Sequence, residues 1–346
     1  MLRIDGSRKS GSGTILRIAI AMAGILNEPL HIYNIRQKRP QPGLKPQHLE
    51  AVLTAAKLCN ATIKGAKLGS KELWFYPNEI VGGKIKAEIG TAGSIPMLII
   101  TVLPLCAFAK SPVSLQISKG GTDVSHSPTI NYLSQIFLAT LKKMGLDVSL
   151  EVHKYGYYPK GMGKVSVRVQ PNQNLVPLRL ERFEQLESVR GISVCTFLAE
   201  RKVAERQAKA ANYFMKKQGV EANIEVLNDF STKSQRGSSI TLWAQTSTDI
   251  ILGSDGIGEL GKPSEIVGRE AAKKLLQEIE ANATVDMYLA DMVVPYMALA
   301  KGESVFFTRL MTDHTETNIW LAKEIFDAKF HTSKIGNLYR VRKLAN

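Results

Sequence analysis

The chain has 346 residues, of which 44% are hydrophobic, so it can bury a sizeable core and is long enough for two domains. Its formal net charge of +14 favours a polyanionic partner, and its longest apolar run, 95–109, is too short to cross a membrane, which argues against a membrane protein. Three widely spaced cysteines, Cys59, Cys106 and Cys195, argue against disulfides and zinc sites and predict buried thiols in a reducing, cytoplasmic setting.

Three segments of the chain share one layout, in which a small-residue helix is followed by a strand, a loop and an amphipathic helix. The strands of these segments begin at Leu30, Val113 and Ser304. Such repetition at long range is typical of duplicated supersecondary units, none of which can close a core alone. Because helices alternate with strands, the sequence predicts an α+β fold, an α/β sandwich in which helices pack on sheets.

The spacing of these three strands predicts an inserted domain. The first two strands start 83 residues apart and the last two start 191 residues apart, so the second interval is longer by 108 residues. A separate strand–helix rhythm restarts near Phe183 and ends near Ala281. We therefore expect a smaller inserted α/β domain at 183–281, and a large domain made of 1–182 and 282–346.

Two glycine-rich turns precede predicted helices, "GSGTILR" at 11–17 and "GTAGSIP" at 90–96. Free backbone N–H groups at a helix start attract anions, so both turns are candidate phosphate sites. The alternative is that glycine and serine only cap the helices and allow close packing. Neither turn has the spacing of a P-loop or of a dinucleotide-binding fingerprint.

The loop "IRQKRPQPGLKPQHL" at 35–49 carries Arg36 and Arg39 directly after a predicted strand. Guanidinium groups bind phosphate through paired hydrogen bonds, and the prolines of this loop reduce the entropy that is lost in holding them in place. The loop is therefore a further candidate phosphate site, with a solvated basic loop as the alternative.

One histidine lies at the junction between a predicted strand and a predicted helix. His314 is part of "TDHTETN" at 312–318, in the third repeat, with Asp313 beside it. Its place at the edge where the other repeats carry their basic loops makes it a candidate nucleophile or general base, although an isolated histidine is usually structural. No serine–histidine–aspartate order and no paired-histidine spacing supports a hydrolase or a metalloprotease.

These motifs together resemble the RNA 3′-terminal phosphate cyclase family. The resemblance rests on "NIRQKRPQPGLKPQHL", "GTAGS", "GGTDVSHSPTINY", "GYYPKGMGKV", "AERQAKAA", "YLAD" and "HTETNIW", which follow the opening "DGS" in the family's order. It extends from Leu2 to beyond Phe330, which is nearly the whole chain. It implies three βαβαββ-type units, as in the C-terminal domain of translation initiation factor three, plus a smaller inserted domain.

The resemblance also implies a reaction. ATP adenylylates a histidine, AMP passes to an RNA 3′-phosphate, and the adjacent 2′-hydroxyl displaces AMP to leave a 2′,3′-cyclic phosphate. The implied partners are ATP and RNA with a 3′-terminal phosphate, together with a divalent metal, Mg²⁺ or Mn²⁺. A homodimer is one assembly that the resemblance allows. Two alternatives stay open: a non-catalytic cyclase-like protein that binds RNA in ribosomal RNA processing, and a small-molecule transferase on a similar scaffold.

Site residues follow from the same resemblance. His314 corresponds to the adenylylated nucleophile, while Arg36 and Arg39 correspond to phosphate- and RNA-binding residues. The nucleotide-binding set that the resemblance implies is Arg17, Gln47, His48, Tyr288, Leu289, Ala290 and Asp291.

The chain departs from the family pattern at several positions. Ser10 stands in place of a glutamate, and Thr14, Ile100 and Met292 stand in place of glutamines. Tyr155 replaces an arginine, and Met162 replaces the middle glycine of a "GGG" signature. Loss of the carboxylate is expected to weaken metal placement, and loss of the amides is expected to loosen ATP positioning. We further expect that Arg8 and Lys9 compensate by contacting phosphate.

Overall fold

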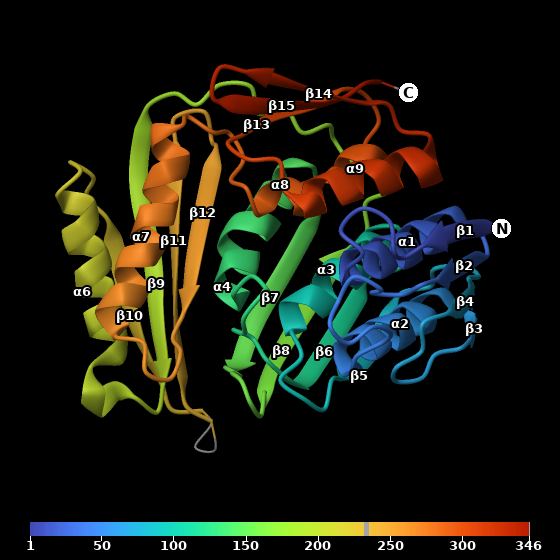
Figure 1. Cartoon of the computed structure of the whole chain (residues 1–346), viewed down its shortest axis with the longest axis horizontal. Helices are drawn as coiled ribbons and strands as arrows, with labels where there is room; N and C mark the ends of the chain where they lie inside the picture. The colour runs from blue at the N-terminus through green and yellow to red at the C-terminus, as the bar shows by residue number, and fades with distance from the viewer. Residues whose placement is uncertain (232–234, 346) are drawn as a thin grey trace.

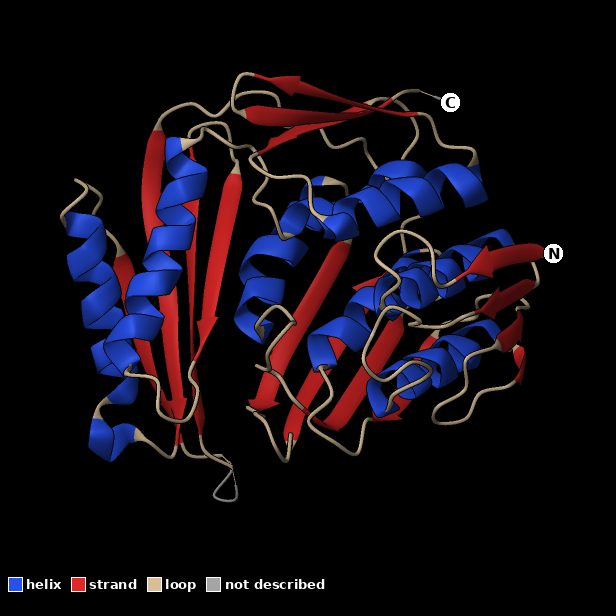
Figure 2. Ribbon diagram, viewed as in Figure 1, coloured by secondary structure: helices blue, strands red, loops and turns tan. Residues whose placement is uncertain are grey.

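The structure is a computed structural model that describes residues 1–231 and 235–345. Four small sheets carry helices between them, and the three sheets of the repeats lie beside the fourth sheet, which comes from the middle of the chain (Figure 1). Helices and strands are intermixed along the whole chain (Figure 2). The predicted α+β fold is confirmed. Among the described residues, no helix combines the length and the apolar character that crossing a bilayer requires.

The first repeat is a four-stranded sheet with two helices on one face. Its strand order is β1-β2-β4-β3, in which only β1 and β2 are parallel. Along β2, Leu30 and Ile32 point into the core, and His31 and Tyr33 point to the other face. The elements are β1 (Leu2–Asp5), α1 (Gly13–Leu26), β2 (Leu30–Tyr33), α2 (Pro46–Cys59), β3 (Thr62–Lys64) and β4 (Leu73–Tyr76).

The second repeat has the same topology. Its strand order, β5-β6-β8-β7, reproduces that of the first sheet, again with one parallel pair, β5 and β6. Its second helix has three consecutive parts, of which the middle one, η1, is π-helical. The elements are β5 (Gly83–Glu88), α3 (Ile95–Ala107), β6 (Val113–Gly120), α4 (Ile130–Tyr132), η1 (Leu133–Leu138), α5 (Ala139–Lys143), β7 (Asp147–Lys154) and β8 (Gly163–Gln170).

The third repeat is interrupted by the insertion. Its sheet has the order β13-β15-β14, and the place of the missing first strand is taken by Arg179, which forms a parallel bridge with Val305. The repeat therefore begins before the insertion and resumes after it. The elements are α8 (Leu289–Leu299), β13 (Ser304–Thr308), α9 (Asp313–Phe326), β14 (Phe330–Ile335) and β15 (Leu338–Lys343). The expected βαβαββ-type order thus recurs three times.

The fourth sheet lies to the left in Figure 1 and has the order β10-β9-β11-β12. α6 and α7 pack against each other and against this sheet, while α4 of the second repeat contacts β11 and β12, and η1 contacts β12. The elements are β9 (Leu186–Thr196), η2 (Ala199–Arg201), α6 (Val203–Lys216), β10 (Asn223–Asp229), β11 (Gly237–Thr246), β12 (Ile251–Ile257) and α7 (Ser264–Glu280). We propose 183–281 as the inserted domain and 1–182 with 282–346 as the large domain. Residues 232–234 and 346 lie outside the described residues.

Candidate active site

The starts of two helices from different repeats meet at one place. α1 and α9 each begin after a capping hydroxyl, from Ser12 and Thr312 respectively. Oγ1 of Thr14, in the first turn of α1, lies 3.0 Å from Nδ1 of His314, in the first turn of α9. Because the free N–H groups and the positive dipole ends of both helices are directed here, the place is suited to an anion.

A buried guanidinium extends this contact. Nη2 of Arg17 donates a hydrogen bond of 3.0 Å to Oγ1 of Thr14, and the Arg17 side chain is buried. Burial lowers the pKa of Arg17 to about 10, although Asp291 opposes this shift. Arg36 and Arg39 lower it further. The side chain remains protonated at neutral pH, so a full positive charge lies two hydrogen-bond contacts from the imidazole.

The glycine in the first turn is required by close packing. A Cβ atom at Gly13 would lie 2.3 Å from Nε2 of His48 and 2.9 Å from Nη1 of Arg17. The start of α2, which carries His48, is therefore pressed against the start of α1. Burial and the charges of Arg17 and Arg36 lower the pKa of His48 to about 2, so its ring is neutral. The turn at 11–17 was interpreted either as a phosphate site or as a cap that allows close packing. Both interpretations apply, because Gly13 permits the close packing and the turn also brings charged groups to one place.

The imidazole of His314 is neutral for the same physical reasons. Partial burial lowers its pKa, and the positive charges of Arg17 and Arg39 act in the same direction. Asp313, the preceding residue in α9, opposes them. A neutral imidazole has one nitrogen with a free lone pair, which is the form that acts as a nucleophile or a base.

The two arginines of the loop 35–49 have different environments. Arg36 adopts a left-handed φ of 56°, and its Nη1 donates hydrogen bonds of 2.8 Å each to the carbonyl oxygens of Gln41 and Gly43. Part of its guanidinium therefore fixes the loop itself. Arg39 is exposed, and its positive charge lowers the pKa values of Arg17, Arg36 and His314. Arg39 is thus the better placed of the two to meet a mobile anion.

Gln47 ties the start of α2 to the start of α3. Its Oε1 accepts a hydrogen bond of 2.7 Å from the backbone N–H of Ser94, whose own hydroxyl caps α3 through Met97. One of the N–H groups that the second glycine-rich turn was expected to offer to an anion is therefore occupied. This favours the capping interpretation for that turn.

The "YLAD" segment forms the start of α8, and its four residues differ in accessibility. Tyr288 is 41% exposed, whereas Leu289 and Ala290 are fully buried. The backbone oxygen of Asp291 accepts a hydrogen bond of 2.6 Å from Asn318 of α9. Burial raises the pKa of Asp291 to about 7. Only Tyr288 presents a large side chain to a ligand, since the side chains of Leu289 and Ala290 are in the core.

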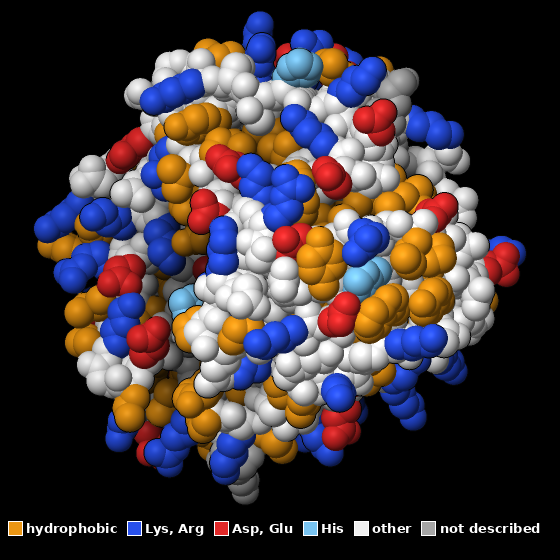
Figure 3. All heavy atoms as spheres, turned by 45° about the vertical axis from the view of Figure 1, so that its right-hand side comes forward, with side chains coloured by type: hydrophobic (Ala, Val, Ile, Leu, Met, Phe, Trp, Pro, Cys, Tyr) orange, Lys and Arg blue, Asp and Glu red, His pale blue; other side chains and the backbone are white. Residues whose placement is uncertain are grey.

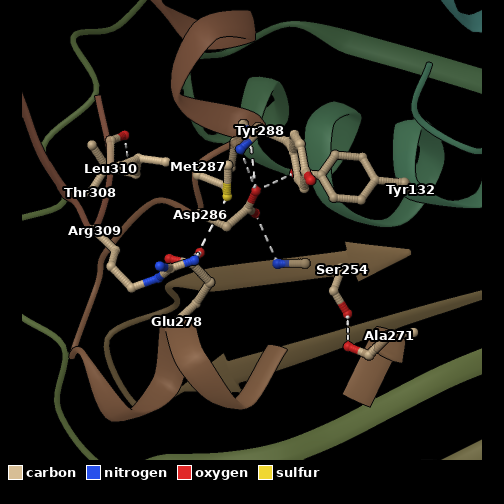
Figure 4. A network of polar contacts seen from close by, with 12 residues as sticks. Tyr132, Ser254, Ala271, Glu278, Asp286, Met287, Tyr288, Thr308, Arg309 and Leu310 are labelled. Carbon is tan, nitrogen blue, oxygen red and sulfur yellow. Dashed lines mark hydrogen bonds and ion pairs between the residues drawn. The ribbon is translucent and has the colours of Figure 1, made fainter. Parts of the chain in front are cut away.

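Asp286, which the sequence analysis missed, holds this segment in place. Its Oδ1 accepts hydrogen bonds of 3.0 Å from the backbone N–H groups of Tyr288 and Leu289 and one of 2.6 Å from the hydroxyl of Tyr132, and its Oδ2 accepts one of 2.9 Å from the N–H of Gly253. Figure 4 shows the Asp286 carboxylate joined to the Tyr132 hydroxyl and to the backbone of Tyr288. One carboxylate therefore joins the second repeat, the fourth sheet and the start of α8. An acidic residue just before a helix is a capping signal that could have identified it.

An ion pair lies beside this network. Arg309, which follows β13, lies 3.0 Å from Glu278 of α7, as Figure 4 also shows. Burial raises the pKa of Glu278 to about 7, with Asp286 acting in the same direction and Arg309 opposing. The pair links the third repeat to the last helix of the inserted segment.

Two of the positions where the family has glutamine are part of the core. Ile100 in α3 and Met292 in α8 are 7% and 8% exposed. A third such position, Thr14, carries the hydroxyl that contacts His314. At Ile100 and Met292 an apolar side chain in the core therefore replaces the family's glutamine. At Thr14 a hydroxyl that contacts His314 replaces it.

Arg8 and Lys9 are directed to α9. The Arg8 guanidinium lies 4.9 Å from the ring centre of Trp320, and the side chain pairs with Glu324 at 3.9 Å. Lys9 pairs with Glu316 at 4.0 Å. Their charges are partly balanced by these carboxylates, so the expected compensation by free phosphate contacts is not supported.

The described residues contain no group of three or more histidine, cysteine, aspartate or glutamate side chains that could hold a metal ion. The three cysteines are free and buried, as predicted. A protein cage for a divalent metal is therefore not formed by the part of the chain that the structure describes.

Comparison with known proteins identifies relatives over the whole chain. A sequence model of a protein family, described as RNA 3′-terminal phosphate cyclase, matches residues 8–332. The chain is 42% identical to the RNA 3′-terminal phosphate cyclase of Pyrococcus furiosus over 347 residues, which cover 99% of each chain. It is 41% identical to the protein of the same name from Pyrobaculum aerophilum, with 98% of this chain and 97% of the relative covered. The corresponding protein of Methanopyrus kandleri is 40% identical, with 94% and 93% covered.

Proposed function

The chain belongs to the RNA 3′-terminal phosphate cyclase family, and from this membership we propose that it uses ATP to convert an RNA 3′-phosphate into a 2′,3′-cyclic phosphate. We propose His314 as the residue that carries AMP. The same membership supports a role in RNA processing, a cytoplasmic location and a homodimeric assembly as further parts of the proposal.

The reaction that we propose has three displacements at phosphorus. Nε2 of His314 attacks the α-phosphorus of ATP, an N–P bond forms, and pyrophosphate leaves. An oxygen of the RNA 3′-phosphate then attacks the same phosphorus, the N–P bond breaks, and AMP passes to the RNA end. Finally the 2′-hydroxyl loses its proton to solvent and attacks the 3′-phosphorus, so that AMP leaves and the ring closes. Such chemistry needs chiefly positioning and neutralisation of charge.

The contact between His314 and Thr14 is the observation that carries the proposal. The Thr14 hydroxyl oxygen has two lone pairs, and one of them accepts the hydrogen bond from Arg17. When the other accepts from Nδ1–H of His314, at 3.0 Å, the lone pair of Nε2 is free. Burial and the charges of Arg17 and Arg39 lower the pKa of His314, which favours the neutral ring and keeps this lone pair available near neutral pH.

Charge neutralisation falls to the residues around the imidazole. Arg17 supplies a fixed, buried charge, and exposed Arg39 supplies one that can follow the substrate. The starts of α1 and α9 add N–H groups and dipoles. We propose Arg17, Gln47, His48 and Tyr288–Asp291 as the nucleotide-binding set, with Arg36 and Arg39 facing phosphate. Gln47, His48, Leu289 and Ala290 serve by shaping the site, because their side chains are bonded within the protein or buried.

A divalent metal fits this site only in part. Since the described residues form no metal cage, we propose that Mg²⁺ or Mn²⁺ enters with the triphosphate of ATP, which supplies oxygen ligands that Mg²⁺ commonly uses. The replacement of a family glutamate by Ser10 agrees with this, because Ser10 Oγ contacts Ser12 Oγ at 3.0 Å and offers no carboxylate.

The proposal is tested by transfer of label from α-labelled ATP to the protein in the presence of Mg²⁺ or Mn²⁺. We expect acid-labile AMP on the wild-type chain and on His331→Ala, which removes an exposed histidine of β14, and none on His314→Ala. His314→Ala should also lose the ability to cyclise a 3′-phosphorylated RNA. Absence of label on the wild-type chain, together with tight RNA binding, would instead support a non-catalytic cyclase-like RNA-binding protein.

A further inference from the structure

The outer face of the first sheet is unusually rich in aromatic side chains. Along β4, Leu73 and Phe75 are fully buried, so the alternating residues Trp74 and Tyr76 point to the opposite face. His31 and Tyr33 of β2 are on that same face. We call the set Arg3, His31, Tyr33, Lys64, Trp74 and Tyr76 the outer face of the first sheet.

Cross-strand register places these side chains in rows. Arg3, His31, Trp74 and Lys64 are consecutive partners across all four strands. The rings of His31 and Trp74 are stacked, with centres 4.6 Å apart and planes at 4°. The ring of Tyr33 lies 5.5 Å from that of His31, and Nζ of Lys64 lies 5.9 Å from the ring of Tyr76. Adjacent rings flanked by cations therefore form one continuous surface.

A hollow of about 370 Å³ opens on this face and is lined by Arg3, His31, Tyr33, Asn34, Lys71 and Glu72. Figure 3, which brings the right-hand side of Figure 1 forward, shows hydrophobic side chains gathered on this side with lysine and arginine side chains among them. The two carboxylates nearby are already partnered: Glu72 accepts from His31 at 2.7 Å, and Asp5 accepts from Asn34 at 3.1 Å. Arg3 and Lys71 have no carboxylate partner within 4.0 Å among the described residues.

The aromatic character is not a property of the fold. The second sheet has the same topology, and its outward residues include Lys84, Lys86, Ser114, Gln116 and Arg168. The described strands β5 to β8 contain no phenylalanine, tyrosine or tryptophan. Since both sheets bury an equivalent inner face, the rings of the first sheet are not needed to build this type of unit.

The outer face of the first sheet leads to the site. β1 and β2 are parallel, so both end at the same edge. β1 is followed by the loop that runs to Ser12 at the start of α1, and β2 is followed by the loop that carries Arg36 and Arg39. The hydrogen bond between Asn34 and Asp5 joins the two exits.

We propose that the outer face of the first sheet binds the single-stranded nucleotides that precede the 3′-terminal phosphate of the RNA. This inference rests on the proposed function, because it assigns a path to that substrate. Bases stack on the rings of Tyr33 and Trp74, and the phosphates between them meet Arg3 and Lys71. The Asn34 amide offers hydrogen bonds to a base edge in the hollow. Stacking of this kind tolerates any sequence, because every base has a π-face.

The main competing surface is the groove of about 820 Å³ on the second sheet, lined by Lys57, Lys84, Lys86 and Arg168. It would attract phosphates but offers no aromatic ring to a base. The outer face of the first sheet is favoured because it combines rings with cations and lies at the ends of the strands that enter the site.

Photo-crosslinking and binding test the inference together. The probe is a 3′-phosphorylated single-stranded RNA of about 10 nucleotides with 4-thiouridine several positions before its end, and the reference is a 3′-phosphorylated dinucleotide. We expect crosslinks to peptides that contain Tyr33 or Trp74. Tyr33→Ala should weaken binding of the longer RNA about 5- to 150-fold, and leave the KM for cyclisation of the dinucleotide unchanged. Tyr33→Phe should restore binding, and Tyr213→Ala, which removes a 63% exposed ring from α6, should have no effect.

Two outcomes would overturn the inference: equal affinity of wild type and Tyr33→Ala for the longer RNA, or crosslinks confined to peptides that carry Lys84, Lys86 and Arg168. Labelling by AMP in the absence of RNA is measured on every variant, which separates this inference from the proposed function, and the circular dichroism spectrum of each variant shows that it is folded. A wild-type chain that crosslinks through Tyr33 but takes no AMP would contradict the cyclase proposal and leave the surface in place.

Discussion

The first and second repeats have the same strand order, and in both the first helix starts after a serine that caps it, Ser12 for α1 and Ser94 for α3. The fifth residue of α1 is Arg17, which is buried beside Thr14 and His314, whereas the fifth residue of α3 is Ile99, which is fully buried in the core. The same position in two copies of one unit is therefore polar in one copy and apolar in the other.

This difference shows how a duplicated unit becomes a site. Strand order and the inner apolar faces supply a common scaffold, and they leave the helix starts and the outer sheet faces free to diverge. In the first repeat those places carry guanidinium groups and rings. In the second repeat the helix start is occupied by Gln47, which accepts a hydrogen bond from the backbone N–H of Ser94, and the outer sheet face is rich in lysine.

The largest expected effect comes from substitution at this fifth position in both repeats. Arg17→Ala should lower the rate of AMP transfer to the protein about 10²- to 10³-fold, because it removes a fixed charge beside the reacting phosphorus. Ile99→Ala should instead lower the free energy of unfolding by about 2–5 kcal/mol, because it leaves a cavity, and the folded fraction should keep its activity. Single-turnover labelling and denaturant unfolding measure the two effects. Equal losses of activity in both variants would remove the proposed asymmetry between the repeats.

Gly13→Ala tests the close approach of α1 and α2 at a position where the first helix of the second repeat has Ile95. The added methyl would meet Nε2 of His48 at 2.3 Å, so we expect a destabilisation of about 1–3 kcal/mol and a slower AMP transfer, by up to about 10²-fold. The double variant Gly13→Ala with His48→Ala should be less destabilised than the two single effects added together, as measured by urea unfolding. Strict additivity would mean that the methyl finds room elsewhere.

The pH dependence of AMP transfer tests the electrostatics of the helix starts. Protonation removes the free lone pair of His314, and burial with Arg17 and Arg39 lowers its pKa below the usual value of about 6.5. The rate should therefore stay level as the pH falls through about 6.5, and decrease only at lower pH. Arg39→Ala removes one of the charges, so the decrease should begin at a higher pH than in wild type. An identical profile for both chains would show that Arg39 is too distant to act.

The smallest effect concerns the hairpins that close the two sheets. The hairpin between β3 and β4 uses Gly65 and Gly69 at φ values of 81° and 76°, whereas the one between β7 and β8 has Met162 at φ 67°. A left-handed conformation costs an L-residue about 1–2 kcal/mol, so Met162→Gly should raise the free energy of unfolding by about 1 kcal/mol without changing AMP labelling. Unchanged or lower stability would show that contacts of the methionine side chain outweigh the strain.

Much of the fold could be predicted from the sequence, because local patterns fix local structure. Runs and spacing of apolar residues predicted two helices that the structure places at 13–26 and 313–326, and the intervals between similar segments predicted a repeated unit with an insertion. The glycine-rich turn at 11–17 predicted a helix start that the structure places at Gly13, and the helix expected after His314 begins at Asp313. His314 was a candidate from its place at a strand–helix junction, whereas its role as the adenylylated residue and the role of Arg17 came only from resemblance to a family.

What the sequence by itself determined is the set of units and the polar residues at their ends. Only the tertiary structure decided that Thr14 meets His314 across 300 positions, that Asp286 joins three parts of the chain, and that Arg8 and Lys9 pair with α9. The physical reason is that periodicity and capping act within a few residues, whereas these contacts depend on how whole helices and sheets pack to bury their apolar faces.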